Sequence, residues 1–203
     1  MLTFWFEFAS TYSCLSALRI EALAQKSGIK VRWRPFLLGP IFKAQGMETS
    51  PFNLYPLKGS YMWRDMERQF AQMGLPSLTV PEAFPQHGLL AARIATLGMR
   101  EEWGKDFTRD VYRAQFMNGK NIGDSTTLAA VLTGLKLNPT AIIESARSDA
   151  SIKAELRLAT EQAQALGIFG APSFTASDGE LFWGNDRLDA AIAWQIRINA
   201  KQS

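Results

Sequence analysis

The sequence predicts an α/β fold in which both ends of the chain build one small sheet and a helical segment lies between them. Apolar and polar residues alternate at residues 2–8 and again at 30–34, as they do in strands, with a helical repeat between the two. Strand-like alternation returns only at residues 173–183. The opening strand, helix and strand form a βαβ unit, so we expect the first two strands to run parallel.

The composition is that of a folded protein with a core. The chain has 203 residues, of which 47% are hydrophobic and 20% charged, and one domain with a large insertion is expected. The net charge of +3 comes from scattered basic residues, which argues against a nucleic-acid partner. No apolar stretch approaches the roughly 18 to 20 residues of a membrane span, and residues 1–10 lack the basic start of a signal peptide. We expect a cytoplasmic protein.

The single cysteine and single histidine exclude several chemistries. Cys14 can form neither an intramolecular disulfide nor a CxxC pair, so protein-disulfide oxidoreductase activity and a thiolate zinc site are not expected. His87 has no partner histidine for a metal, and no metal site is expected. We interpret Cys14 as a core residue and His87 as a loop or cap residue. Hydroxyls, amides, carboxylates, lysines or a borrowed cofactor remain for catalysis.

Each predicted element has a local signal. The first strand, residues 2–8, carries aromatic residues on both faces, which indicates a central strand. A helix at 11–27 ends at Gly28, and the second strand, 30–34, ends at Pro35. Residues 40–56 are rich in Gly, Pro, Ser and Asn, so we expect a loop or short helical turns there. Further helices are predicted at 61–73, 88–97, 101–117, 125–135, 139–148 and 152–166.

The end of the chain returns to strands. Residues 173–176 and 180–183 flank Asp178-Gly179, a hairpin signal, and Asn185 or Asp186 is placed to cap a helix at 187–198. This order of elements is that of a thioredoxin-like fold with an α-helical domain inserted after its second strand. We assign residues 1–36 and 167–203 to the thioredoxin-like domain and 37–166 to the loop and helical insertion.

Three segments meet at one end of this fold. Ser10 lies at the junction of the first strand and the first helix. Two interpretations are open: Ser10 is a simple N-cap, or its hydroxyl donates a hydrogen bond to a thiolate brought by a ligand. Pro172 precedes the third strand. It either protects the edge of the sheet or is a cis proline that leaves Ala171 free to pair with an extended peptide. In thioredoxin-like redox enzymes, two cysteines with the same spacing stand at the positions that Ser10 and Ser13 occupy here.

The third segment runs from Trp183 through Gly184 and Asn185 to Asp186. It is either a strand end with a helix cap or the place where a helix N-terminus accepts a carboxylate while Asp186 pairs with an α-ammonium group. A zwitterionic end, an extended peptide and a thiol together describe glutathione.

The sequence resembles the 2-hydroxychromene-2-carboxylate isomerase family and its relatives, the kappa-class glutathione transferases, over nearly the whole chain. The matching motifs are Phe6-Glu7-Phe8-Ala9-Ser10 with Tyr12-Ser13, Lys43 and Asn53, Gly59-x-Tyr61-Met62-x-Arg64-Asp65, Gly167-Ile168-Phe169-Gly170-Ala171-Pro172, and Phe182-Trp183-Gly184-Asn185-Asp186-Arg187-Leu188. Two departures are Thr11, where a proline is common, and Leu54, where the naphthalene-pathway type has a basic residue.

The resemblance implies a role for each matching site residue. Ser10 would be catalytic and stabilise the glutathione thiolate, while Lys43 and Asn53, followed by Leu54, would meet a small aromatic keto acid. Glutathione would be held by Ser10, Ala171, Pro172, Trp183, Gly184, Asn185 and Asp186. Lys58 is a second candidate for the acid.

The implied activity is a glutathione-dependent cis-trans isomerisation. It would interconvert 2-hydroxychromene-2-carboxylate and trans-o-hydroxybenzylidenepyruvate, as in naphthalene degradation and other aromatic hydrocarbon catabolism, and the enzyme would be a homodimer. Two alternatives stay open: a general kappa-class transferase or peroxidase, and a non-catalytic thioredoxin-like module that binds peptides at Pro172. A serine hydrolase is disfavoured because the sequence has no G-x-S-x-G turn.

Overall fold

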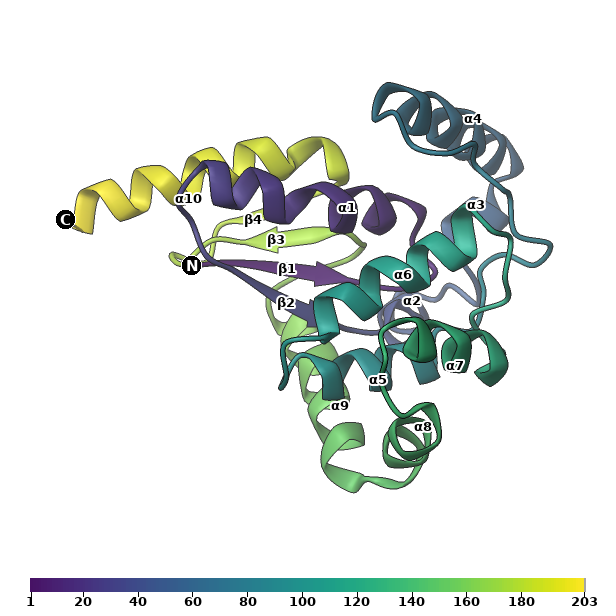
Figure 1. Cartoon of the computed structure of the whole chain (residues 1–203). Helices are drawn as coiled ribbons and strands as arrows, with labels where there is room; N and C mark the ends of the chain where they lie inside the picture. The colour runs from purple at the N-terminus through teal and green to yellow at the C-terminus, as the bar shows by residue number, and fades with distance from the viewer. Residues whose placement is uncertain (203) are drawn as a thin grey trace.

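A single mixed sheet joins the two ends of the chain (Figure 1). A computed structural model describes residues 1–202, so Ser203, the last residue of the expected 167–203 segment, lies outside the described residues. In this part of the chain four strands take the order β2-β1-β3-β4. They are β1 (Leu2–Phe6), β2 (Val31–Pro35), β3 (Ser173–Thr175) and β4 (Leu181–Trp183). β1 pairs parallel with β2 and antiparallel with β3, which confirms the predicted parallel start and the central first strand.

Two long helices cover one face of the sheet, α1 (Thr11–Lys26) and α10 (Leu188–Gln202) (Figure 1). Phe4 and Phe6 point to this face and are fully buried, because alternate residues of a strand share one side. The Phe4 ring stacks on Phe174 of β3 with its centroid 5.5 Å away. This aromatic layer packs β1 against α1 and so fixes the position of the turn that joins them.

The opposite face of the sheet packs against α9 (Ala150–Ala165). Trp5 meets Phe36 edge to face at a centroid distance of 6.2 Å, and small residues of α9, Ala159 and Ala163, lie in the same buried cluster. Small side chains let the helix approach closely, so this face forms a second, smaller core.

Helices fill the chain between β2 and β3, as predicted. They are α2 (Leu38–Ala44), α3 (Pro51–Leu54), α4 (Pro56–Gln72), α5 (Leu89–Gly98), α6 (Gly104–Phe116), α7 (Ser125–Gly134), α8 (Pro139–Ser148) and α9. The segment 40–56 holds the short helical turns α2 and α3, and α4 begins at Pro56, five residues before its expected start, because proline is well tolerated in the first helical turn. α4 stands apart from the cluster of α5 to α8 (Figure 1). None of the helices in residues 1–202 combines the length and apolarity that crossing a membrane requires.

Polar side chains cap several of the helices, including one at a predicted boundary. Asn138 caps α8 by accepting the Ala141 N–H at 3.2 Å, at the predicted boundary. The expectation that Asn185 or Asp186 caps the last helix is wrong for the described residues, in which neither side chain accepts a backbone N–H. A 3₁₀ turn, η1 (Asn185–Arg187), precedes α10 instead, and the Asn185 carboxamide bonds across to α1.

The cysteine packs as expected from the sequence, and three tryptophans lie in or against the same core. Cys14 is fully buried in α1, and burial raises the pKa of its thiol well above the ordinary value. Trp33 is buried in the main core, and Trp63 and Trp103 pack against that core. The thiol therefore stays neutral and has the character of a small apolar side chain.

Candidate active site

Ser10 lies at the centre of the candidate site. It precedes α1 in an extended conformation, and its Oγ accepts the Ser13 N–H at 3.2 Å, which makes it the N-cap of the helix. The same Oγ donates a hydrogen bond of 2.8 Å to the carbonyl of Ala171. The Ala171–Pro172 peptide bond is cis, one of the two possibilities left open for this proline, and pairing of Ala171 with a peptide stays a prediction. The fold thus brings the helix start and the cis proline into direct contact.

The cis bond leaves one side of Ala171 available. Its carbonyl accepts from Ser10, while its N–H meets no acceptor among residues 1–202. The Gly184 N–H donates to the Pro172 carbonyl at 2.9 Å, which ties the end of β4 to the same loop. An unpaired amide beside a cis proline can pair with an extended peptide.

Trp183 forms an aromatic wall beside this loop. Its side chain is 52% exposed, and its ring lies 4.8 Å from the Phe169 ring, centroid to centroid. A Cβ at Gly170 would come within 2.5 Å of the indole Nε1, so only a glycine there lets the indole lie against the loop. The half-exposed indole is thereby held next to Ala171 and open to a ligand.

Gly184 and Asp186 shape the end of β4. Gly184 has a φ of +105°, a backbone conformation that favours glycine, and Asp186 Oδ1 lies 2.5 Å from where a Cβ would be. The Asp186 carboxylate is exposed, and its nearest cation is the Arg187 guanidinium at 3.6 Å. A weakly paired carboxylate at this position is available to a ligand ammonium group.

Known proteins are similar to this chain over nearly its whole length. Residues 1–192 match the family described as DSBA-like thioredoxin domain. A 2-hydroxychromene-2-carboxylate isomerase of Sphingobium xenophagum is 31% identical over 189 residues, which cover 93% of this chain and 94% of that protein. The chain belongs to the 2-hydroxychromene-2-carboxylate isomerase family.

Two further comparisons agree with this family. A glutathione S-transferase kappa 2 of Caenorhabditis elegans is 24% identical over 203 residues, covering 93% of this chain and 88% of that protein. A solved structure of a 2-hydroxychromene-2-carboxylate isomerase matches with a TM-score of 0.83 and 26% identity, over 100% of this chain and 98% of that one. The predicted thioredoxin-like fold, the family resemblance and the isomerase class of enzyme are confirmed.

Asn185 of this isomerase-family chain lies deeper than expected for a residue that touches ligand. It is buried, and its Oδ1 accepts from Ser16 Oγ at 3.0 Å and from Arg19 Nε at 3.1 Å. Its Nδ2 donates to Gln69 Oε1 at 2.9 Å, and Arg19 also donates to its backbone carbonyl at 2.7 Å. The side chain therefore positions the β4–α10 turn against α1.

A hydrogen-bond chain extends this contact to α4. Gln69 donates to Asp65 Oδ2 at 2.8 Å, and the Tyr12 hydroxyl donates to the same oxygen at 3.1 Å. Partial burial and the facing Asp65 carboxylate raise the pKa of Tyr12 above its ordinary value. Sequence reasoning gave Asp65 and Gln69 no role, although Asp65 ends one of the family motifs. Together they attach the protruding helix to the residues around Ser10.

The three expected substrate residues lie on α2 and α3. Lys43 is exposed, and its ammonium forms no ion pair with any described residue. Asn53 donates to the carbonyl of Phe84 at 2.9 Å, just before a second cis proline bond, Phe84–Pro85. Leu54 is exposed beside it. No direct contact joins these three side chains to Ser10 within residues 1–202, so their role in binding the acid stays a prediction.

α3 nevertheless lies beside the helix that Ser10 begins. The ring of Phe52, the residue before Asn53, is 6.4 Å from the Tyr12 ring, centroid to centroid. Lys58, the second candidate for the acid, lies on α4 with its ammonium 4.8 Å from the centre of the Tyr55 ring. His87 is exposed in the loop before α5, which agrees with the predicted loop position.

Glu7 is a site residue that sequence reasoning missed. Its carboxylate accepts the Ala9 N–H at 2.8 Å, and its backbone carbonyl accepts from the Ser10 N–H at 3.1 Å and the Tyr112 hydroxyl at 2.8 Å. Burial raises the pKa of Glu7 from 4.5 to about 7. Its place in the first family motif, three residues before Ser10, is the only sequence signal that could have found it.

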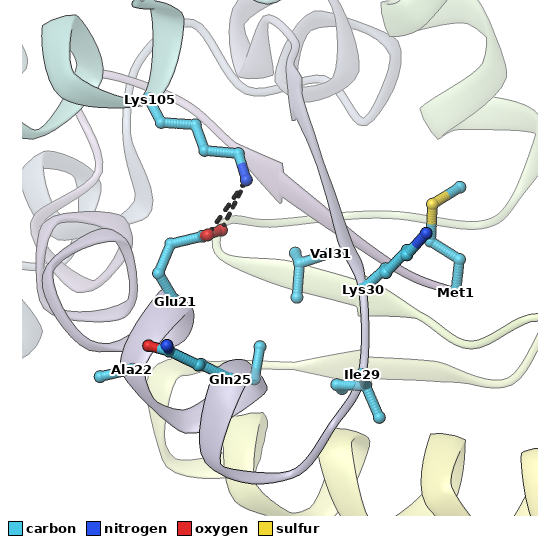
Figure 2. Close-up of a pocket in the computed structure, with 9 residues that line it drawn as sticks. Met1, Glu21, Ala22, Gln25, Ile29, Lys30, Val31 and Lys105 are labelled. Atoms are coloured by element: carbon cyan, nitrogen blue, oxygen red, sulfur yellow. Dashed lines mark hydrogen bonds and ion pairs between the residues drawn. The ribbon is translucent and has the colours of Figure 1, made fainter. Parts of the chain in front are cut away.

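Two surface hollows lie outside the site. One, of about 610 Å³, is bounded by α1, the start of the chain and β2, with Lys105 bridging to Glu21 across one side (Figure 2). The other, of about 400 Å³, lies on the sheet face that carries Trp5 and Arg34. None of the predicted site residues lines either hollow, so neither bears on the chemistry at Ser10.

Proposed function

We propose that this enzyme uses glutathione to interconvert 2-hydroxychromene-2-carboxylate and trans-o-hydroxybenzylidenepyruvate, or a close aromatic analogue, in aromatic hydrocarbon catabolism such as naphthalene degradation. The observation that carries the proposal is the hydrogen bond from Ser10 to Ala171, which joins a hydroxyl, a helix N-terminus and a cis proline at one point. A hydroxyl cannot exchange disulfides. The sulfur must therefore come from a ligand.

The residues around Ser10 fit glutathione in three respects. The Ser10 hydroxyl can donate to a thiolate, the unpaired N–H of Ala171 can pair with the backbone of a tripeptide, and the exposed carboxylate of Asp186 can meet an α-ammonium group. The half-exposed indole of Trp183 supplies an apolar wall between these polar groups. Asn185 supports the turn from behind.

When bound, glutathione supplies a thiolate that adds reversibly to the conjugated double bond of the keto acid and so permits rotation about that bond. Ser10 contributes by turning its hydroxyl proton from the Ala171 carbonyl toward the thiolate. The N–H groups in the first turn of α1 and the helix dipole favour the same negative charge and lower the pKa of a bound thiol.

The organic acid is held by different residues in this proposal. The unpaired ammonium of Lys43 binds the pyruvate carboxylate, because a charge-assisted hydrogen bond is about twice as strong as a neutral one. Asn53 donates to the carbonyl of Phe84 and to Thr49 Oγ1, and can present its amide oxygen to the substrate. Leu54 offers an apolar contact to the aromatic ring.

The proposal is tested by calorimetry with glutathione and by the ultraviolet absorbance change of a hydroxybenzylidene pyruvate. We expect saturable binding and a turnover rate that depends on glutathione concentration. Absence of binding, or isomerisation that proceeds equally well without glutathione, would contradict it.

General glutathione transfer is the second candidate, supported by the similarity to a kappa-class transferase. This activity would use the same glutathione site at Ser10 but would not need a pocket for the keto acid. Faster conjugation of electrophiles than isomerisation of the keto acid would favour this alternative.

A homodimer in a reducing cytoplasm completes the proposal. Apolar side chains on α3 and α4 face solvent, with Leu57 87% exposed and Tyr61 64% exposed, beside Leu54 and Tyr55. Such a patch is typical of an interaction surface. Sedimentation analysis of the wild type and of Leu57→Glu tests it, because a charge at the centre of an apolar interface should shift a dimer to monomer.

A further inference from the structure

Glu7 is a partly buried acid in the turn that presents Ser10. Its Oε2 accepts the N–H of Ala9, the residue before Ser10, at 2.8 Å. Its backbone carbonyl is fixed by the Ser10 N–H and the Tyr112 hydroxyl. The backbone of Glu7 is therefore fixed by two hydrogen bonds, and its carboxyl is held by the Ala9 N–H.

The surroundings leave this carboxyl without a compensating cation. No Lys, Arg or His nitrogen lies within salt-bridge distance of it in the described part of the chain. Its second oxygen, Oε1, faces Gly88 at the start of α5, where a Cβ would lie 3.3 Å away. The glycine leaves room for the carboxyl. The Ala9 N–H stabilises the anion but does not offset the cost of its desolvation.

The neighbouring titratable groups cannot share its role. Tyr112 of α6 and Cys14 of α1 are fully buried, and burial raises the pKa of each above its ordinary value, so both stay protonated at neutral pH. Arg113 acts on Cys14 and is paired with Asp110 at 2.6 Å. His87, next to Gly88, is exposed. Glu7 is the group in this cluster poised to change its proton occupancy near pH 7.

We propose that Glu7 takes up the proton that leaves the glutathione thiol, so that the site holds one negative charge and not two. The inference rests on the proposed function. The S–H bond breaks, the proton ends on the Glu7 carboxyl, and no electron is transferred. Two anions in one partly buried site repel each other, so formation of a thiolate at Ser10 favours protonation of the carboxyl that bonds to the same turn.

Calorimetry in buffers of different ionisation enthalpy measures the proton count directly at pH 7.5. For the wild type we expect glutathione binding to release well under one proton, because Glu7 retains it. Glu7→Gln keeps an acceptor for the Ala9 N–H but cannot take up a proton, so about one proton should be released, given a thiol pKa of about 8.5. S-methylglutathione, which has no thiol proton, should release none from either protein.

His87→Asn is the matched control and should behave as the wild type. Equal proton release from the wild type and Glu7→Gln, with glutathione bound to both, would overturn the role of Glu7 alone. A shift of proton release with His87→Asn would overturn it too. Absence of glutathione binding to the wild type would overturn the proposed function, and the role of Glu7 with it.

A measurement on the wild type alone covers the case in which Glu7→Gln does not fold. Infrared difference spectra with and without glutathione should show the carbonyl stretch of a newly protonated carboxylic acid. S-methylglutathione should not produce it. Absence of this band on glutathione binding would contradict the proposal.

Discussion

The hydroxyl of Ser10 donates to the carbonyl of Ala171 at 2.8 Å, although the two residues are 161 positions apart in the chain. The hydrogen bond joins the start of α1 to the cis proline before β3. In the ligand-free protein the hydroxyl proton is thus engaged by the backbone, and a thiolate must compete for it. Removal of the hydroxyl should therefore affect both the helix cap and the stabilisation of a bound thiolate.

Ser10→Ala should lower kcat by about 100-fold or more, the usual cost of one donor that stabilises developing negative charge. Loss of the N-cap should cost about 1 kcal/mol of stability, with the fold retained. Steady-state kinetics and circular dichroism measure the two effects. Asn138→Ala removes the cap of α8 at a comparable cost and should leave turnover unchanged. Normal turnover in Ser10→Ala would refute the catalytic role.

Asp186→Asn should weaken glutathione binding about tenfold, because the exposed carboxylate then lacks the charge for an ammonium group. Calorimetry should also show that a glutathione analogue without the α-amino group binds the variant and the wild type alike. Asp189→Asn serves as the matched control. It removes an exposed carboxylate of α10 that pairs with Arg19 of α1. Equal losses in the two variants would point to a general charge effect.

Asn185→Ala should destabilise the fold by about 2 to 3 kcal/mol, since it leaves buried partners on Ser16 and Arg19 unsatisfied. Urea denaturation gives the free energy of unfolding. Gln69→Ala removes the hydrogen bonds of Gln69 to Asn185 and to Asp65 and should cost about 1 to 2 kcal/mol, and the double variant should cost less than the sum. Strict additivity would mean that the α4 contact is independent of the turn.

Lys43→Ala should raise KM for the keto acid without changing the affinity for glutathione. The unpaired ammonium is proposed to meet only the carboxylate of the acid, so its loss removes one ionic contact of about 1 kcal/mol, or about fivefold in KM. Lys153→Ala, an exposed lysine on α9, is the control. An unchanged KM in Lys43→Ala, with the effect found in Lys58→Ala, would transfer the role to Lys58.

The stability of the ligand-free protein should fall between about pH 4.5 and pH 7 because of Glu7. Its pKa is raised from 4.5 to about 7 on folding, so the folded state binds more protons than the unfolded state in this range. Below pH 4.5 the group is neutral in both states, and above pH 7 the buried anion costs up to about 3 kcal/mol. Chemical denaturation across this range should show a smaller fall for Glu7→Gln.

Local patterns were sufficient for most of the fold. Period-two alternation located β1 and β2, and Asn138-Pro139 marked the start of α8 at its observed residue. These signals are short-range, because a strand or a helix start depends on neighbours within a few positions. The same reasoning placed Ser10 at a helix N-terminus, where a hydroxyl meets free N–H groups.

Long-range packing decided the parts of the site that local patterns left open. The sequence of Ala171-Pro172 allows either isomer, and only the surrounding fold selects cis. Asn185 has the features of a local cap, but Ser16 and Arg19 are closer partners once η1 lies on α1, so it became a buried support. Glu7 resembles any acidic residue at a strand end until Gly88 and Tyr112 close over it, and burial then changes its pKa. The residue types and their local order were determined by the sequence alone, whereas burial and contact between distant segments, which set protonation and hydrogen-bond partners, arose only in the folded chain.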